Sequence, residues 1–134
     1  QLSASIEFVD LHPNLSLVLD HVAKPRIGDG LMEPWKDQMF EMARRENVSC
    51  KLSGMATEAN WTEWTFDTLR PYMDVALEAF GPDRLMFGSD WPVARLAVDY
   101  EPWVELCRKF ISTLSGDERE AIEGGNAIRE YRLD

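Results

Sequence analysis

The chain has 134 residues, about the size of one domain, and 45% of them are hydrophobic, which is enough to bury a core. Its net charge of −10 argues against binding to nucleic acid or to an anionic membrane surface, because both need clustered lysine or arginine. No apolar run is long enough for a membrane span, and no signal peptide is visible. Cys50 and Cys107 lack metal-type spacing and lie in apolar patterns, so we expect buried free thiols in a reducing, cytoplasmic compartment, with a disulfide between them as the open alternative.

The first part of the chain alternates between helical and strand-like patterns. Apolar residues recur at helical spacing in residues 1–12, and the residue before Pro13 ends this helix because it disfavours the helical conformation. Residues 16–19 form a short β-prone run, and a loop follows to residue 33. A second helix is predicted to open at Pro34, since proline suits the first helical turn. One face of this helix is apolar and comprises Trp35, Met39, Met42 and Ala43.

The middle of the chain continues the alternation. Residues 48–52 predict a second strand, and Asn60 with Glu63 predicts a short helix after it. Pro71 is expected to open the next helix, and Gly81-Pro82 is expected to stop it. The apolar face of that helix comprises Tyr72, Val75, Ala76, Ala79 and Phe80.

The last part of the chain begins with a bare apolar run at residues 84–87, which predicts a third, buried strand. A helical stripe follows, made of Trp103, Leu106, Cys107, Phe110 and Leu114. Ser115 with Glu118 matches a capping box that opens another helix. Gly124-Gly125 is expected to interrupt the helical structure, and residues 126–131 to add a last turn or two.

The spacing of the strands determines the predicted fold class. Strands end at Asp20, Leu52 and Phe87, and the gaps have about the length of a βαβ unit. This rhythm predicts an α/β fold with parallel strands and right-handed crossovers. The carboxyl ends of such strands share one edge, where α/β proteins place their chemistry. The residues that follow the strands are Asp20, His21 and Lys24; Ser53 and Gly54; and Ser89, Asp90 and Trp91.

Asp90 and His21 are the candidate chemical groups at this edge. Taken locally, Asp90 could equally be a helix cap or an Asx-turn residue, and His21 an ordinary satisfied polar residue. Their common edge favours function, because an aspartate near a histidine can bind a divalent ion or act as a general base for water. Lys24 and Lys51 could hold a substrate carboxylate or an oxyanion, although Lys51 lies inside a strand and needs a polar partner there. Trp91 could form a wall of the site or belong to the core.

Several motifs stand in order across nearly the whole chain. They are Leu19-Asp20-His21 with Lys24-Pro25; Lys51-Leu52-Ser53-Gly54; Phe80-Gly81-Pro82-Asp83-Arg84-Leu85-Met86-Phe87-Gly88-Ser89-Asp90-Trp91-Pro92-Val93; and Asn126-Ala127 before Tyr131. Together they resemble the amidohydrolase-related family (amidohydrolase family 2). More narrowly, they resemble the sugar-lactone hydrolases of the fuconolactonase and rhamnonolactonase type.

The resemblance implies a fold and a place within it. The family is a distorted (β/α)8 TIM barrel, for which about 250 residues is typical, so residues 1–134 are expected to be a partial domain, the C-terminal half. The three strands would be the sixth to eighth of the barrel. By this resemblance His21 matches the histidine of the sixth strand, and Asp90 matches the metal-associated general base of the eighth. The family's first-strand His-x-His pair and its fifth-strand site residue would lie upstream of Gln1.

The implied activity is the opening of a sugar lactone by a water that Asp90 activates, with His21 as the second catalytic residue. Lys24, Lys51, Ser53 and Trp91 are the expected substrate-binding residues of a small-molecule site. A divalent metal, zinc or similar, is expected in the full-length protein, with Asp90 and His21 as its ligands here. Two alternatives stay open: a decarboxylase of the same superfamily, and a non-catalytic half-barrel that forms oligomers through its exposed sheet edges.

Overall fold

The computed structural model describes residues 1–133 and shows a three-stranded sheet with the strand order β1-β2-β3. All pairs are parallel, as predicted. Leu17 pairs with Val48 at the start of the first pair, and Cys50 pairs with Leu85 at the start of the second. The strands are β1 (Leu17–Leu19), β2 (Val48–Leu52) and β3 (Leu85–Phe87).

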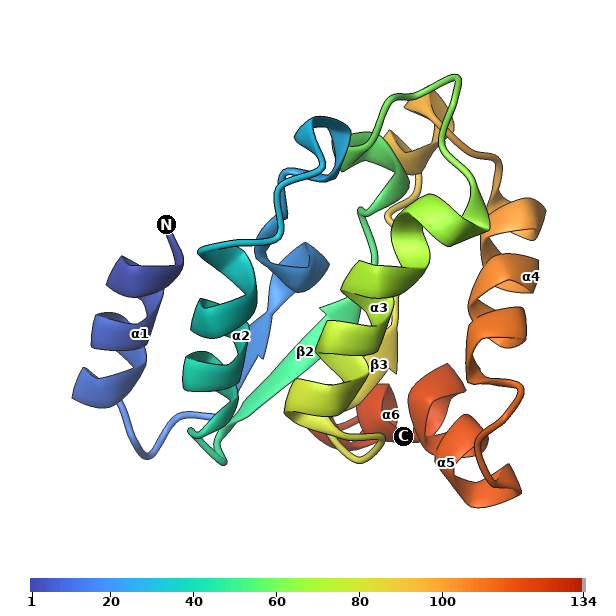
Figure 1. Cartoon of the computed structure of the whole chain (residues 1–134). Helices are drawn as coiled ribbons and strands as arrows, with labels where there is room; N and C mark the ends of the chain where they lie inside the picture. The colour runs from blue at the N-terminus through green and yellow to red at the C-terminus, as the bar shows by residue number, and fades with distance from the viewer. Residues whose placement is uncertain (134) are drawn as a thin grey trace.

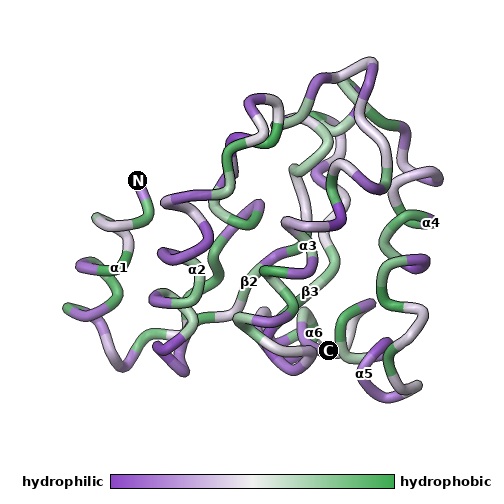
Figure 2. The backbone as a smooth tube through the Cα atoms, viewed as in Figure 1, coloured by the Kyte–Doolittle hydropathy of each residue, from purple (hydrophilic) through white to green (hydrophobic). Residues whose placement is uncertain are grey.

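Most of the helices lie on one face of this sheet, and helices follow the strands in alternation (Figure 1). The longer helices are amphipathic, and Figure 2 shows hydrophobic and hydrophilic segments following one another along α4. Their apolar sides pack with the sheet into one core. The helices are α1 (Leu2–Leu11), α2 (Trp35–Ala43), α3 (Phe66–Phe80), α4 (Tyr100–Ile111), α5 (Gly116–Glu120) and α6 (Asn126–Tyr131).

The central strand β2 has two unlike faces, because side chains alternate along a strand. Val48, Cys50 and Leu52 belong to the core beneath the helices. Ser49 and Lys51, the two polar side chains of β2, point to the opposite face. The predicted need of Lys51 for a polar partner is met on this face by Asp20, whose carboxylate lies 3.0 Å from Lys51 Nζ.

The predicted start of the third helix was wrong. Pro71 lies inside α3, which begins at Phe66 after the N-cap residue Thr65. Thr65 and Thr68 form a reciprocal capping box, so the first turn is satisfied without a proline. Pro71 removes one hydrogen-bond donor near the beginning of the helix, and the packing of the apolar face outweighs that loss.

Two further local predictions were wrong. Asn60 and Glu63 form a hydrogen-bonded turn instead of a helix, with the Asn60 amide donating to the Glu63 carboxylate at 2.8 Å. Gly124-Gly125 does not interrupt the helical structure, because it lies in a wider helical turn (Ala121–Gly125) that runs into α6. The capping box of Ser115 was confirmed: its hydroxyl accepts from the Glu118 amide, and the Glu118 carboxylate accepts from the Ser115 amide.

The C-terminal helix α6 is tied to the amino ends of the strands. The Asn126 amide donates to the carbonyls of Pro82 and Leu85, at 2.7 and 2.6 Å. The Glu130 carboxylate accepts from Ser16 at 2.6 Å and from Ser49 at 2.9 Å. These bonds place α6 at the end of the sheet opposite to the loops that follow the strands.

Both cysteines are buried and free, as predicted, and burial raises the pKa of each thiol. Among the helices of residues 1–133, none combines the length and the apolar character that crossing a bilayer requires.

Candidate active site

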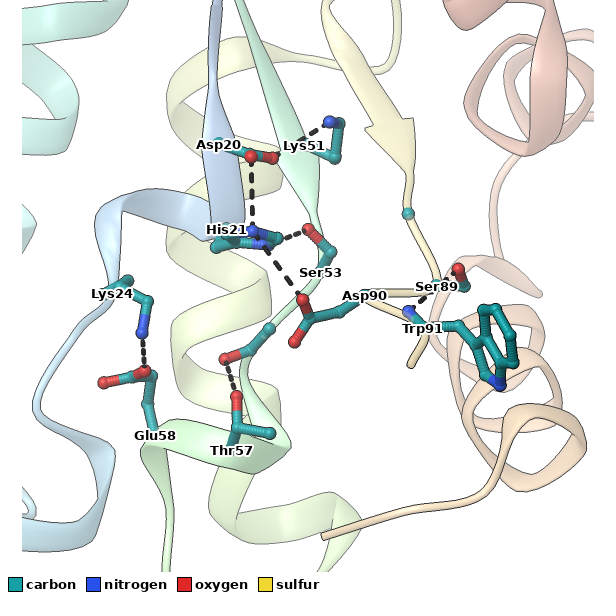
Figure 3. Close-up of polar contacts among 12 residues, drawn as sticks. Asp20, His21, Lys24, Lys51, Ser53, Thr57, Glu58, Ser89, Asp90 and Trp91 are labelled. Atoms are coloured by element: carbon teal, nitrogen blue, oxygen red, sulfur yellow. Dashed lines mark hydrogen bonds and ion pairs between the residues drawn. The ribbon is translucent and has the colours of Figure 1, made fainter. Parts of the chain in front are cut away.

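The loops after the three strands gather at one end of the molecule, at the top of Figure 1. This is the carboxyl edge of the parallel sheet. His21 follows β1, Ser53 follows β2 and Asp90 follows β3, and the structure brings the three side chains together (Figure 3). The predicted convergence of strand ends is therefore present.

The His21 imidazole lies at the centre of this cluster. Its Nδ1 lies 2.8 Å from the Ser53 hydroxyl, which fixes one side of the ring. Its Nε2 lies 3.2 Å from Asp20 Oδ2 and 3.7 Å from Asp90 Oδ1. Gly54 makes this placement possible, because a Cβ at that position would lie 2.9 Å from the His21 ring. The ring is thus held by a buried hydroxyl on one side and faces two carboxylates on the other.

A left-handed turn carries His21. The four residues 21–24 have φ between 43° and 57°, although none is glycine. Such a backbone costs roughly 1–2 kcal/mol per residue, and it is especially unusual for the β-branched Val22. Complete burial of the Val22 side chain and a 2.7 Å hydrogen bond from the Trp35 indole to the Val22 carbonyl oppose this cost. Strain of this kind collects at functional sites.

Asp90 also has a left-handed backbone, with φ 55°, and its carboxylate is 12% exposed. The 3₁₀ turn that follows, Val93–Leu96, has Pro92 at its N-cap and no side-chain cap. Asp90 supports the turn through its backbone carbonyl, which accepts from the Ala94 amide at 2.8 Å. The reading of Asp90 as a helix cap is therefore wrong, and its carboxylate is directed at His21 instead (Figure 3).

Lys51 reaches the same cluster from the polar face of β2. Its Nζ lies 3.0 Å from Asp20 Oδ1 and 5.6 Å from the centre of the Tyr131 ring. Gly88 leaves space for the lysine stem, since a Cβ there would lie 2.8 Å from Lys51 Cδ. Burial lowers the pKa of Lys51, but its contacts with Asp20 and Tyr131 outweigh burial, so its pKa lies above the ordinary value. The amine is a fixed cation beside the site.

The other predicted substrate-binding residues are placed differently. Lys24 forms an ion pair with Glu58 at the rim of the site. Trp91 is mostly exposed and points away from the His21 cluster in Figure 3. Ser53 is fully buried, so its hydroxyl is available to His21 rather than to solvent.

Two residues of this edge were given no role from the sequence. Asp20 contacts both Lys51 and His21, and Glu58 pairs with Lys24. The Asp20-His21 pair at a strand end was a usable signal, because consecutive residues in a tight turn can point to one place. Glu58 gave no such signal, because its partner lies 34 residues away in the sequence.

The donors at this edge fit a metal ion only in part. Imidazole nitrogen and carboxylate oxygen are zinc ligands, and a catalytic zinc commonly takes three of them from the protein. Within residues 1–133 there is no group of three or more histidine, cysteine, aspartate or glutamate side chains arranged to hold a metal ion. His21 and Asp90 therefore fit as two ligands of a larger set, and the described residues alone do not form a metal centre.

Parallel strands joined by helices, with polar side chains converging at their carboxyl ends, define part of an α/β barrel. The family model described as Amidohydrolase matches residues 1–133, and the chain belongs to that family. It is 43% identical to an L-fucono-1,5-lactonase of Burkholderia ambifaria over 99% of this chain and 47% of that protein. It is 42% identical to an L-fucono-1,5-lactonase of Burkholderia multivorans over 87% of this chain and 43% of that protein.

The fold is also shared with a solved structure, an amidohydrolase of Burkholderia multivorans with bound zinc. The TM-score is 0.95 at 41% identity, and the match covers all of this chain and 50% of that one. The chain thus spans about half the length of its relatives. This similarity confirms the predicted fold class, half of an amidohydrolase TIM barrel, with the three parallel strands and their helices in place.

Proposed function

We propose that this chain supplies the water-activating part of a sugar-lactone hydrolase. The observation that carries the proposal is the approach of Asp90 Oδ1 to His21 Nε2, at 3.7 Å, from two separate strand ends. The relatives named L-fucono-1,5-lactonase, at 42 and 43% identity, support a lactone of a sugar acid as the substrate class.

In the proposed mechanism Asp90 accepts a proton from a water molecule, and the resulting hydroxide attacks the lactone carbonyl. His21 and the Lys51 cation stabilise the negative charge that develops on the carbonyl oxygen. The carbonyl then re-forms as the ring C–O bond breaks, and the proton held by Asp90 passes to the departing ring oxygen. One lactone and one water thereby give one hydroxy acid.

The remaining residues would orient this chemistry. Ser53 fixes the His21 ring through Nδ1, while Lys24 lies at the rim, where it would meet the sugar rather than the carbonyl. A divalent metal, if held by His21 and Asp90 with further ligands, would lower the pKa of a bound water and polarise the carbonyl.

We further propose that residues 1–134 are the C-terminal part of one barrel domain in the full-length protein. The edges of β1 and β3 are unpaired in the described residues, which is consistent with a sheet that continues on both sides. The non-catalytic alternative gives no role to the close approach of His21 and Asp90. The barrel proposal uses both residues in catalysis.

The test is a substrate panel for the full-length gene product. We expect the full-length protein to release acid from aldonolactones, which pH-stat titration measures. We expect it to release no carbon dioxide from aromatic or muconate-type acids. Release of carbon dioxide without lactone opening would replace the proposal by the decarboxylase alternative. No turnover of either class would favour the non-catalytic one.

A further inference from the structure

Asp20 holds a position that the proposed mechanism leaves unused. One of its carboxylate oxygens lies 3.0 Å from Lys51 Nζ, and the other lies 3.2 Å from His21 Nε2. The two oxygens of one side chain thus contact two groups of the candidate site that come from different strands. Figure 3 shows Asp20 between Lys51 and His21.

We propose that Asp20 is a positioning residue that holds the Lys51 ammonium and the His21 imidazole side by side for the reaction. The inference rests on the proposed lactone hydrolysis. It assigns Asp20 no contact with substrate: its effect passes through Lys51 and His21.

The geometry favours this role over a simple surface ion pair. Lys51 has a long flexible stem, and an exposed ion pair would not order it. Here the stem is confined where it crosses Gly88, and the Tyr131 ring lies beside the ammonium. Asp20 then fixes the end of a side chain whose path is already restricted.

The backbone supports the same conclusion. Asp20 directly precedes the left-handed turn of residues 21–24, so its carboxylate and the His21 ring can meet at one point. An extended strand would send the two side chains to opposite faces of the sheet. The strained turn therefore brings Asp20 and His21 to the same edge of the sheet. There Asp20 contacts Lys51, and His21 faces Asp90.

The test uses the full-length protein with Asp20→Asn, Asp20→Glu, Lys51→Met and the double variant Asp20→Asn/Lys51→Met. We expect Asp20→Asn to lower kcat roughly 10–100-fold, the usual effect of losing an orienting partner. KM should change little, because the lost alignment matters in the transition state. Asp20→Glu keeps the carboxylate and should restore part of kcat. The double variant should lose less than the combined losses of Asp20→Asn and Lys51→Met, since part of the effect of Asp20 passes through Lys51.

Asp10→Asn is the matched control. Asp10 is as exposed as Asp20 (53 and 54%) and pairs with Arg45 at 2.9 Å, but it lies on α1, away from the site. Its variant should keep kcat, and both variants should have similar melting temperatures. If the wild type is active and Asp20→Asn keeps its kcat, the inference is overturned. It is also overturned if a lower melting temperature of Asp20→Asn accounts for the loss of kcat.

Crystal structures of the wild type and of Asp20→Asn separate this inference from the proposed function. A wild type inactive on lactones would reject the lactonase proposal alone. The inference is then tested by the side-chain positions in the two crystal structures. The Lys51 ammonium and the His21 ring should lie farther apart in Asp20→Asn than in the wild type. Unmoved side chains would overturn it.

Discussion

At the scale of single residues, Gly54 determines where the His21 ring can lie. It has φ +65°, and a Cβ there would lie 2.9 Å from three atoms of the histidine. Gly81 is a natural comparison, because it has φ +69° with no atom within 4 Å of a built Cβ. The two glycines share a positive φ and differ in what surrounds them.

We therefore expect both Gly54→Ala and Gly81→Ala to lose stability, about 1–3 kcal/mol each, because both place a side chain at a positive φ. Only Gly54→Ala should also lose lactone hydrolysis, because its methyl group displaces His21. Chemical denaturation and steady-state kinetics of the full-length protein measure the two effects. Equal activity of both variants would show that the position of the ring is unimportant.

The sequence predicted the convergence of His21 and Asp90 because strand ends of a parallel sheet meet at one edge. It could not predict the partners of the lysines. Lys24 pairs with Glu58, and Lys51 pairs with Asp20. Such pairs depend on loop conformation, here on a left-handed turn of non-glycine residues, and local preferences argue against that conformation.

At the scale of elements, the alternating apolar patterns were sufficient to predict the order of strands and long helices. The errors occurred where a local sequence signal for a helix start or a helix break was outweighed by other contacts in the folded chain. Pro71 looks like a helix start, but the threonine capping box six residues earlier opens α3 instead. Gly124-Gly125 looks like a break, yet Asn126 anchors the following turn to the Pro82 and Leu85 carbonyls and the helical path continues.

The attachment of α6 should depend on pH. Hydrogen bonding by Ser16 lowers the pKa of Glu130 below its ordinary value of 4.5, with smaller help from Ser49 and Arg129. A carboxylate whose pKa is lower in the folded state stabilises the fold above the unfolded pKa, and this stabilisation is lost as pH falls through the folded pKa. The stabilisation by Glu130 is therefore present at neutral pH and disappears below pH 4.5.

Glu130→Gln should consequently be less stable than the wild type at pH 7, and the difference should shrink as the pH falls below 4.5. Urea denaturation of both proteins across this range measures it. Glu78→Gln, on the exposed side of α3, is the control and should leave stability unchanged. A difference between wild type and Glu130→Gln that stays constant with pH would contradict the role given to the carboxylate.

At the scale of the whole molecule, the two outer strands are the feature with the largest consequence. β1 and β3 each pair on one side only within residues 1–133. A groove of about 360 Å³ lies along β1 and α1, and Phe8 of α1 lines it with its side chain half exposed. Unpaired edges beside apolar surface favour association between chains.

We expect the 134-residue chain, when expressed alone, to associate in a concentration-dependent manner. Phe8→Lys should weaken this association, because it places a charge beside the open edge of β1. Leu96→Lys changes an exposed apolar residue in the Val93–Leu96 turn and should not. Sedimentation equilibrium measures the mass of each, and a monomer at every concentration would reject oligomerisation through sheet edges.

The proposed function depends on Asp90, which is to activate the water that opens a lactone. The most direct measurement is kcat for aldonolactone hydrolysis by the full-length protein and its Asp90→Asn variant, with Asp74→Asn on the exposed side of α3 as control. We predict a loss of roughly 10²–10⁴-fold for Asp90→Asn, the usual contribution of a general base, and none for the control. Full activity in Asp90→Asn would show that Asp90 does not activate the water.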